Sequence, residues 1–107
     1  MKTEWLDTSR EDMFALYAWH SKDSQRRAVK IYNGLIADVE RIAANPGMGF
    51  IEPLLEGLEY EFRTVVARSK NHKIIYFTDE DTVFVYRIWD CRQSPSKLRP
   101  GLLKKKP

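Results

Sequence analysis

Cysteine and histidine are scarce in this chain, and their scarcity excludes several kinds of site. Cys91 is the only cysteine, so no disulfide can form within the chain. His20 and His72 are far apart in sequence, and no pair of Cys or His residues has the short spacing of a zinc site. No histidine lies near Cys91 in sequence, so we do not expect it to act as a nucleophile. We therefore expect neither a metal nor an organic cofactor.

Long apolar runs are also missing. No stretch approaches the roughly 20 residues that a membrane-spanning helix needs, and the N-terminus lacks the apolar region of a signal peptide. We therefore expect a cytoplasmic protein without membrane contact. A hydrophobic fraction of 43% with 31% charged residues is typical of a folded domain. The sequence predicts one domain over residues 1–99 and a short basic tail over residues 100–107.

Charge is distributed unevenly along the chain. Residues 1–60 carry seven Lys and Arg against ten Asp and Glu, whereas residues 61–107 carry eleven against five. A basic half of this kind favours a polyanionic partner. A simpler interpretation also stands, because Lys104, Lys105 and Lys106 supply a large share of the excess and solvated basic tails are common.

Two helices are predicted in the first half of the chain. A short strand over residues 2–6 precedes a helix that begins among the N-cap residue types of residues 7–9. A second helix over residues 24–45 is the clearest element, because its apolar residues recur with a 3.6-residue period. An Asn-Pro-Gly sequence at residues 45–47 ends it. The short link between the two helices predicts an antiparallel helical hairpin.

Three runs rich in Val, Ile, Phe, Tyr and Thr make up most of the second half. They cover residues 61–67, 73–78 and 82–89, with turn-like gaps between them. Gaps this short predict an antiparallel meander. Helices followed by strands predict an α+β fold, in which the helical hairpin packs on one face of an antiparallel sheet. We expect the other face to be partly open.

Basic side chains recur near the ends of these strands. They are Arg63, His72, Lys73, Arg87 and Arg92. A meander would bring them near one another, and like charges side by side on a sheet repel. The cluster therefore favours an anion-binding surface, although single charged residues on exposed strands are also common.

Five short strings follow one another in a family-like order. They are Asn45-Pro46-Gly47-Met48-Gly49, Glu52-Pro53-Leu54, Tyr60-Glu61-Phe62-Arg63, His72-Lys73-Ile74-Ile75-Tyr76 and Ile88-Trp89-Asp90-Cys91-Arg92-Gln93. Their order and spacing resemble the RelE/ParE superfamily of bacterial type II toxins over almost the whole sequence. The Glu-Pro-Leu string is similar to the YoeB branch, in which this glutamate takes part in mRNA cleavage.

The resemblance implies a toxin with a small antitoxin partner, and it leaves two activities open. RelE-like members cut mRNA in the ribosome, whereas ParE-like members inhibit DNA gyrase. Fold alone does not choose between them. We expect the first activity, a ribosome-dependent mRNA endonuclease. The alternative is a non-enzymatic gyrase inhibitor, and a weaker one is a relative that keeps only antitoxin binding. We expect the antitoxin to lie across the helical hairpin and the basic groove of the sheet.

The resemblance also assigns the site. Metal-free RNA cleavage needs a base for the ribose 2′-hydroxyl, an acid for the leaving oxygen and cations for the phosphorane. Glu52 is the candidate base, and Arg63, Lys73 and Arg92 are candidate phosphate contacts. His72 is the candidate acid, because imidazole titrates near neutral pH. Each could instead be an ordinary loop or strand residue.

Two features depart from the RelE-like pattern and favour the gyrase alternative. Lys73 stands where the superfamily often has arginine, and lysine cannot bind a phosphate bidentately. No Tyr or His follows Tyr86, although RelE-like members carry one near the C-terminus. Tyr76 and Tyr86 are interpreted as core residues, and so is Trp89, which could otherwise stack on a base.

Overall fold

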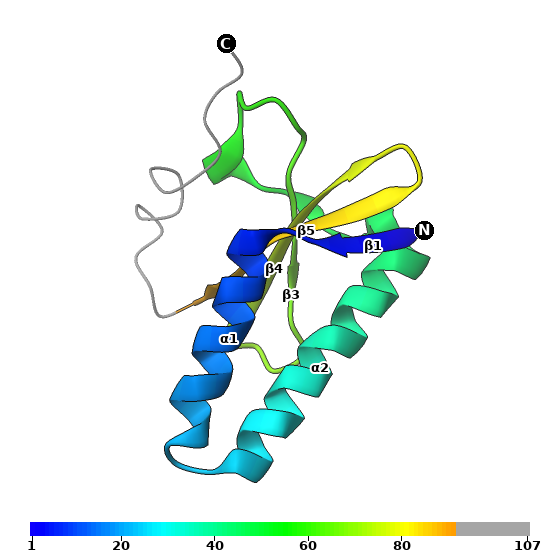
Figure 1. The fold of residues 1–107 in the computed structure, drawn as a ribbon. Coiled ribbons are helices and arrows are strands. Elements are labelled where there is room, and N and C mark those ends of the chain that lie inside the picture. Colours follow the sequence, from blue (N-terminus) through cyan, green and yellow to red (C-terminus); the bar gives the residue numbers. More distant parts are fainter. Residues whose placement is uncertain (92–107) are drawn as a thin grey trace.

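The computed structural model describes residues 1–91, which form a helical hairpin and a five-stranded sheet. In chain order the elements are β1 (Lys2–Trp5), α1 (Asp7–Ser21), α2 (Gln25–Ala44), β2 (Phe50–Ile51), β3 (Arg63–Val66), β4 (His72–Asp79) and β5 (Thr82–Asp90). Short 3-10 turns cover Pro46–Met48 and Pro53–Leu55. Figure 1 shows α1 and α2 running antiparallel on one side of the sheet, so the predicted α+β fold is confirmed. The predicted tail lies outside the described residues.

The sheet has the strand order β1-β5-β4-β3-β2. The predicted antiparallel meander is confirmed for β3, β4 and β5. The expectation of a wholly antiparallel sheet is wrong, because β1 pairs in parallel with β5, from Lys2 opposite Thr82 to Trp5 opposite Val85. The two-residue strand β2 pairs antiparallel with β3. The sheet is therefore mixed, with a short strand at each edge.

Helix α2 supplies most of the helical side of the first core. The Ser24 hydroxyl caps it by accepting a hydrogen bond from the Arg27 N–H at 3.1 Å. Its apolar positions then face the sheet, as the period predicts. The buried members of this core on α2 are Leu35, Val39 and Ile42. They pack against Ile74 and Tyr76 of β4, among others, and so fix the hairpin to one face of the sheet.

The opposite face of the sheet carries a second core. Its buried residues are Leu55, Phe62, Ile75, Phe77, Tyr86 and Trp89. The expectation that this face is partly open is wrong, because the segment of residues 55–62 folds over it and stacks Tyr60 on Phe77 with ring centroids 4.1 Å apart. The interpretation of Tyr76, Tyr86 and Trp89 as core residues agrees with their burial.

Side chains of α1 cover the outer edge of β5. Strand β1 pairs only with the first half of β5, which leaves backbone groups of the second half without a strand partner. The Thr8 hydroxyl donates a hydrogen bond to the Tyr86 carbonyl at 2.7 Å, and the Asp12 carboxylate accepts one from the Ile88 N–H at 3.0 Å. Thr8 therefore pairs the sheet edge rather than capping α1, whose N-cap residue, Leu6, makes no side-chain cap. Covering an edge in this way protects it from pairing with other chains.

Candidate functional site

Glu52, the predicted general base, is buried beneath the loop that follows β2. Its side chain is 4% exposed. Oε1 accepts a hydrogen bond from the Thr64 hydroxyl at 2.8 Å, and Oε2 accepts one from the Leu54 N–H at 3.1 Å. The carboxylate thus caps the 3-10 turn at Pro53–Leu55 and ties that turn to β3. Both of its oxygens make contacts that hold the loop.

Arg63, a predicted phosphate contact, is also held by neighbouring groups of the chain. It donates a hydrogen bond from Nη1 to the Gly49 carbonyl at 2.8 Å and forms an ion pair with Glu61 at 3.2 Å. Arg63 and Thr64 are consecutive in β3, so their side chains leave opposite faces of the sheet. The carboxylate of Glu52, which bonds Thr64, is therefore not brought together with the guanidinium of Arg63.

His72 and Lys73 are separated by the same alternation. His72 is 4% exposed and lines the helical side of the sheet, near α1 and α2. Lys73 leaves the other face, where it stands opposite Trp89 of β5. Lys73 of β4 and Arg63 of β3 also lie at opposite ends of the β3–β4 pairing, since Lys73 pairs with Val66 and Arg63 pairs with Tyr76. The described candidates do not form one cluster.

Arg92 completes the predicted set, but it lies outside the described residues. Arg87, which the strand-end cluster also included, forms a two-pronged ion pair with Asp12. The bonds run from Nε to Oδ2 at 2.7 Å and from Nη2 to Oδ1 at 2.9 Å. The hydrogen bonds to Asp12 raise the pKa of Arg87 above its ordinary value, although burial acts to lower it. This cation therefore joins α1 to β5 rather than facing solvent.

Tyr76 holds one of the five family-like strings, residues 45–49, in place. Its hydroxyl donates a hydrogen bond to the Pro46 carbonyl at 2.6 Å and accepts one from the Gly49 N–H at 3.1 Å. A Cβ atom on Gly49 would lie only 2.7 Å from this hydroxyl, so no larger residue fits there without a shift. Burial raises the pKa of Tyr76, while the Gly49 hydrogen bond and Arg63 act to lower it. The Asn-Pro-Gly-Met-Gly string thus docks the end of α2 on β4.

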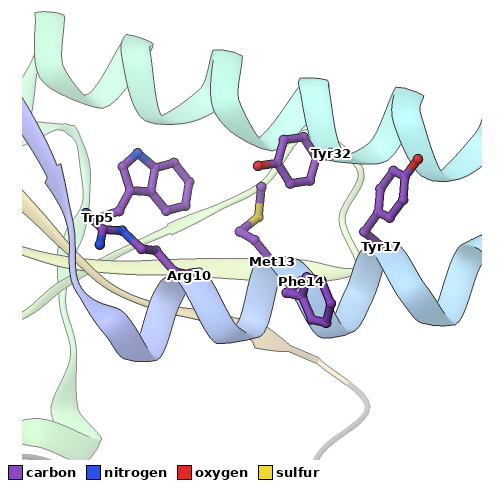
Figure 2. Close-up of a pocket in the computed structure, with 6 residues that line it drawn as sticks. All are labelled: Trp5, Arg10, Met13, Phe14, Tyr17 and Tyr32. Atoms are coloured by element: carbon purple, nitrogen blue, oxygen red, sulfur yellow. The ribbon is translucent and has the colours of Figure 1, made fainter.

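The helical hairpin carries a groove that the sequence interpretation missed. This aromatic groove is lined by Trp5, Arg10, Met13, Phe14, Tyr17 and Tyr32 and has a volume of about 590 Å³. In Figure 2, Met13 of α1 and Tyr32 of α2 lie side by side in the middle of the groove, with Trp5 towards one end and Tyr17 of α1 towards the other. The rings of Tyr17 and Tyr32 meet edge to face at 5.9 Å. Phe14 on the rim is 78% exposed. The sequence of α1 could have indicated this groove, because its aromatic residues are too many to lie on one buried face of the helix.

Arg10 gives this groove a charged end beside Trp5 (Figure 2). An exposed apolar hollow with a single cation suits an apolar segment of a partner protein that carries an acidic residue. Within residues 1–91, no helix is long and apolar enough to cross a membrane. The same residues bring no three potential metal ligands together.

The fold is thus a helical hairpin packed on a mixed five-stranded sheet. A chain of the solved chromosomal ParDE toxin–antitoxin system from P. aeruginosa has this fold, with a TM-score of 0.70 and 15% sequence identity. The match covers 84% of this chain and 95% of that chain. Residues 3–95 match the family described as the ParE toxin of type II toxin–antitoxin system, parDE, and this chain belongs to that family. No protein of curated function matches it in sequence.

Proposed function

We propose that this ParE-family toxin acts in the cytoplasm by binding and inhibiting DNA gyrase, without cutting RNA. The observation that carries the proposal is the environment of Glu52. A general base must come within hydrogen-bond distance of the ribose 2′-hydroxyl. The Glu52 carboxylate is buried, and each of its oxygens already accepts a hydrogen bond from the protein. Exposing it would require the turn at Pro53–Leu55 to open.

The mRNA endonuclease expected from the sequence becomes the second candidate. One observation favours it, because Lys73 stands opposite Trp89 and the Arg87 guanidinium lies 5.1 Å from the Trp89 ring. Cations and an aromatic ring therefore share one end of the sheet, as nucleotide-binding surfaces do. Trp89 is only 5% exposed, however, and Arg87 is held by Asp12. Neither is available to a nucleotide in this conformation.

Two assays on the purified chain separate the candidates. We expect the protein to inhibit gyrase in a DNA supercoiling assay and to create no new 5′ ends on a message undergoing translation. The opposite pattern, in which new 5′ ends appear while supercoiling is unaffected, would replace the proposal with the ribonuclease.

Substitution of Glu52 sharpens this comparison. As a folding contact, Glu52→Gln should lower the free energy of unfolding by about 1–2 kcal/mol while gyrase inhibition per folded molecule is retained. As a catalytic base, the same variant should lose RNA cleavage with its stability intact. Glu56→Gln is the matched control, because Glu56 is an exposed carboxylate of the same loop. The two variants should differ in stability and agree in inhibition.

Family membership implies an antitoxin partner, and we propose that a segment of it docks in the aromatic groove across the helical hairpin. Phe14→Ser should weaken co-purification with the product of the neighbouring gene, because it removes an exposed apolar wall without disturbing the core. Trp19→Ser is the control, since Trp19 is also exposed on α1 but lies outside the groove against Lys22. Equal co-purification of both variants would locate the antitoxin elsewhere.

A further inference from the structure

A second concave surface, here called the basic cleft, lies between α2 and the turn that joins β3 to β4. Its volume is about 790 Å³. Five basic residues and one acidic residue line it: His20, Arg27, Lys30, Arg68, His72 and Asp38. It shares no lining residue with the aromatic groove. The cleft is thus a separate surface that carries a net positive charge even with both histidines neutral.

The acidic residue does not offset this excess. The Asp38 side chain is 3% exposed and binds Arg68 through Nε at 2.6 Å and Arg41 at 3.3 Å. Arg27 and Lys30, which are exposed on the α2 wall, form no ion pair with any acidic side chain of the described part of the chain. Two cations therefore face the cleft without internal compensation.

Two features of helix α2 lower its own stability. Its first turn contains Arg26 and Arg27 and no acidic residue, although positive charge at a helix N-terminus is unfavourable. Gly34 lies inside this 20-residue helix, where alanine would be more favourable. A Cβ atom on Gly34 would meet nothing within 4 Å among residues 1–91, so packing within this part of the chain does not require glycine. The missing side chain instead leaves the wall of the cleft open to close approach by another backbone.

We propose that the basic cleft binds an acidic segment of a partner protein, with the segment's backbone beside Gly34 and its carboxylates at Arg27 and Lys30. The partly exposed apolar side chain of the cleft, Ile31, is aliphatic and suits an apolar residue of a peptide. Single-stranded nucleic acid sites combine cations with aromatic stacking surfaces. No Phe, Tyr or Trp is among the described residues that line this cleft. The lining chemistry therefore favours a peptide over a nucleic acid.

Fluorescence anisotropy with the purified full chain tests this site directly. The probe is a short fluorescein-labelled peptide composed of Glu, Ala and Leu, and the same peptide with Gln in place of Glu is the reference. The double variant Arg27→Gln with Lys30→Gln should raise the Kd of the acidic peptide about tenfold. Arg26→Gln is the matched control, because it removes a cation from the same helix turn without touching the cleft. It should leave the Kd within about twofold of the unmodified chain.

A second test is Gly34→Ala, which should raise stability and lower peptide affinity. The substitution should raise the melting temperature, because it improves helix propensity at a position with free space. It should nevertheless weaken peptide binding, because the added methyl occupies the place of the approaching backbone. A structural role alone would not move stability and affinity in opposite directions.

Three results would overturn the proposal. The first is equal loss of binding in the Arg26→Gln control and the double variant, which would indicate diffuse attraction to the whole helix. The second is unchanged affinity in Gly34→Ala. The third is binding of a single-stranded oligonucleotide, but not of the acidic peptide, with the same dependence on Arg27 and Lys30, because that would assign the cleft to nucleic acid.

Discussion

The ion pair between Asp12 and Arg87 should be the strongest single attachment of α1 to the sheet. Both side chains are 17% exposed, and the Asp12 carboxylate also accepts the Ile88 N–H. In Asp12→Ala the guanidinium would be left largely buried without its partner, and the sheet edge would lose a hydrogen bond. Removing one partner of a buried pair costs about 3–5 kcal/mol. Partial access to water places this site at the lower end, near 3 kcal/mol.

Urea unfolding followed by circular dichroism measures this loss. Each 1 kcal/mol should lower the melting temperature by about 4–8 °C in a domain of this size, so the thermal midpoint should fall by about 12–24 °C. Asp7→Ala is the control, because Asp7 forms a 3.6 Å ion pair with Arg10 between two exposed side chains. That variant should lose less than about 1 kcal/mol, because it removes only an exposed pair and a first-turn carboxylate of α1.

A double-mutant cycle tests the physical reason for the loss. Replacing Arg87 with Met in the Asp12→Ala background removes the stranded charge and should recover much of the stability, as replacement of buried pairs by apolar residues often does. A loss below about 0.5 kcal/mol in Asp12→Ala, within the range of ordinary surface substitutions, would refute the reasoning. So would a cycle in which the two substitutions act additively.

Three further substitutions or conditions test other contacts. Gly49→Ala should cost about 1–3 kcal/mol through overpacking against the Tyr76 hydroxyl, whereas Gly47→Ala, whose Cβ would meet nothing within 4 Å, should be nearly neutral in urea unfolding. Asp38→Ala should cost about 2 kcal/mol and speed hydrogen exchange at the Arg68 amide, because that amide and the exposed guanidinium of Arg68 lose their shared acceptor. Burial raises the pKa of Tyr76, so the unfolded chain releases this proton first, and stability should fall as pH rises above about 10. Tyr76→Phe should flatten that decline, and a slope equal to that of the unmodified chain would contradict the assignment.

Local signals in the sequence were sufficient for the long helix and for the antiparallel meander, but not for the pairing of β1. Helix α2 was predicted over residues 24–45 and occupies Gln25–Ala44, with Ser24 and Asn45 at its two ends. Its period and its flanking residues both act within a few positions of the chain. The parallel pairing of β1 with β5 joins residues from opposite ends of the domain. No local pattern encodes such a pairing, and short gaps between strands indicate only antiparallel neighbours.

The second core could have been inferred from β4. Its residues Ile74, Ile75, Tyr76 and Phe77 are all apolar, and continuous apolar runs are typical of strands that are buried on both faces. The placement of both helices on one face led instead to the expectation that the other face is partly open. The residues that cover this face lie in a loop with no regular period, so only the structure locates them.

The geometry of the candidate site could not be predicted from its motifs, because a motif specifies residue types and not their surroundings. The Glu-Pro-Leu string predicted a base at Glu52, but neither its burial nor its bond to Thr64 is visible in a three-residue string. The alternation rule did contain part of the answer. Consecutive strand residues such as His72 and Lys73 leave opposite faces, which already places a proposed acid and its phosphate contact on different sides of the sheet.

Three buried or half-buried carboxylates connect these observations. Asp12, Asp38 and Glu52 each accept a backbone N–H together with a side-chain donor, and each joins two segments of the fold. Substitution of any of them should therefore reduce the amount of folded toxin more than its activity per folded molecule. A toxicity assay in cells mixes these two quantities, so loss of toxicity alone would imitate the loss of a catalytic acid or base. Activity must therefore be measured per folded molecule.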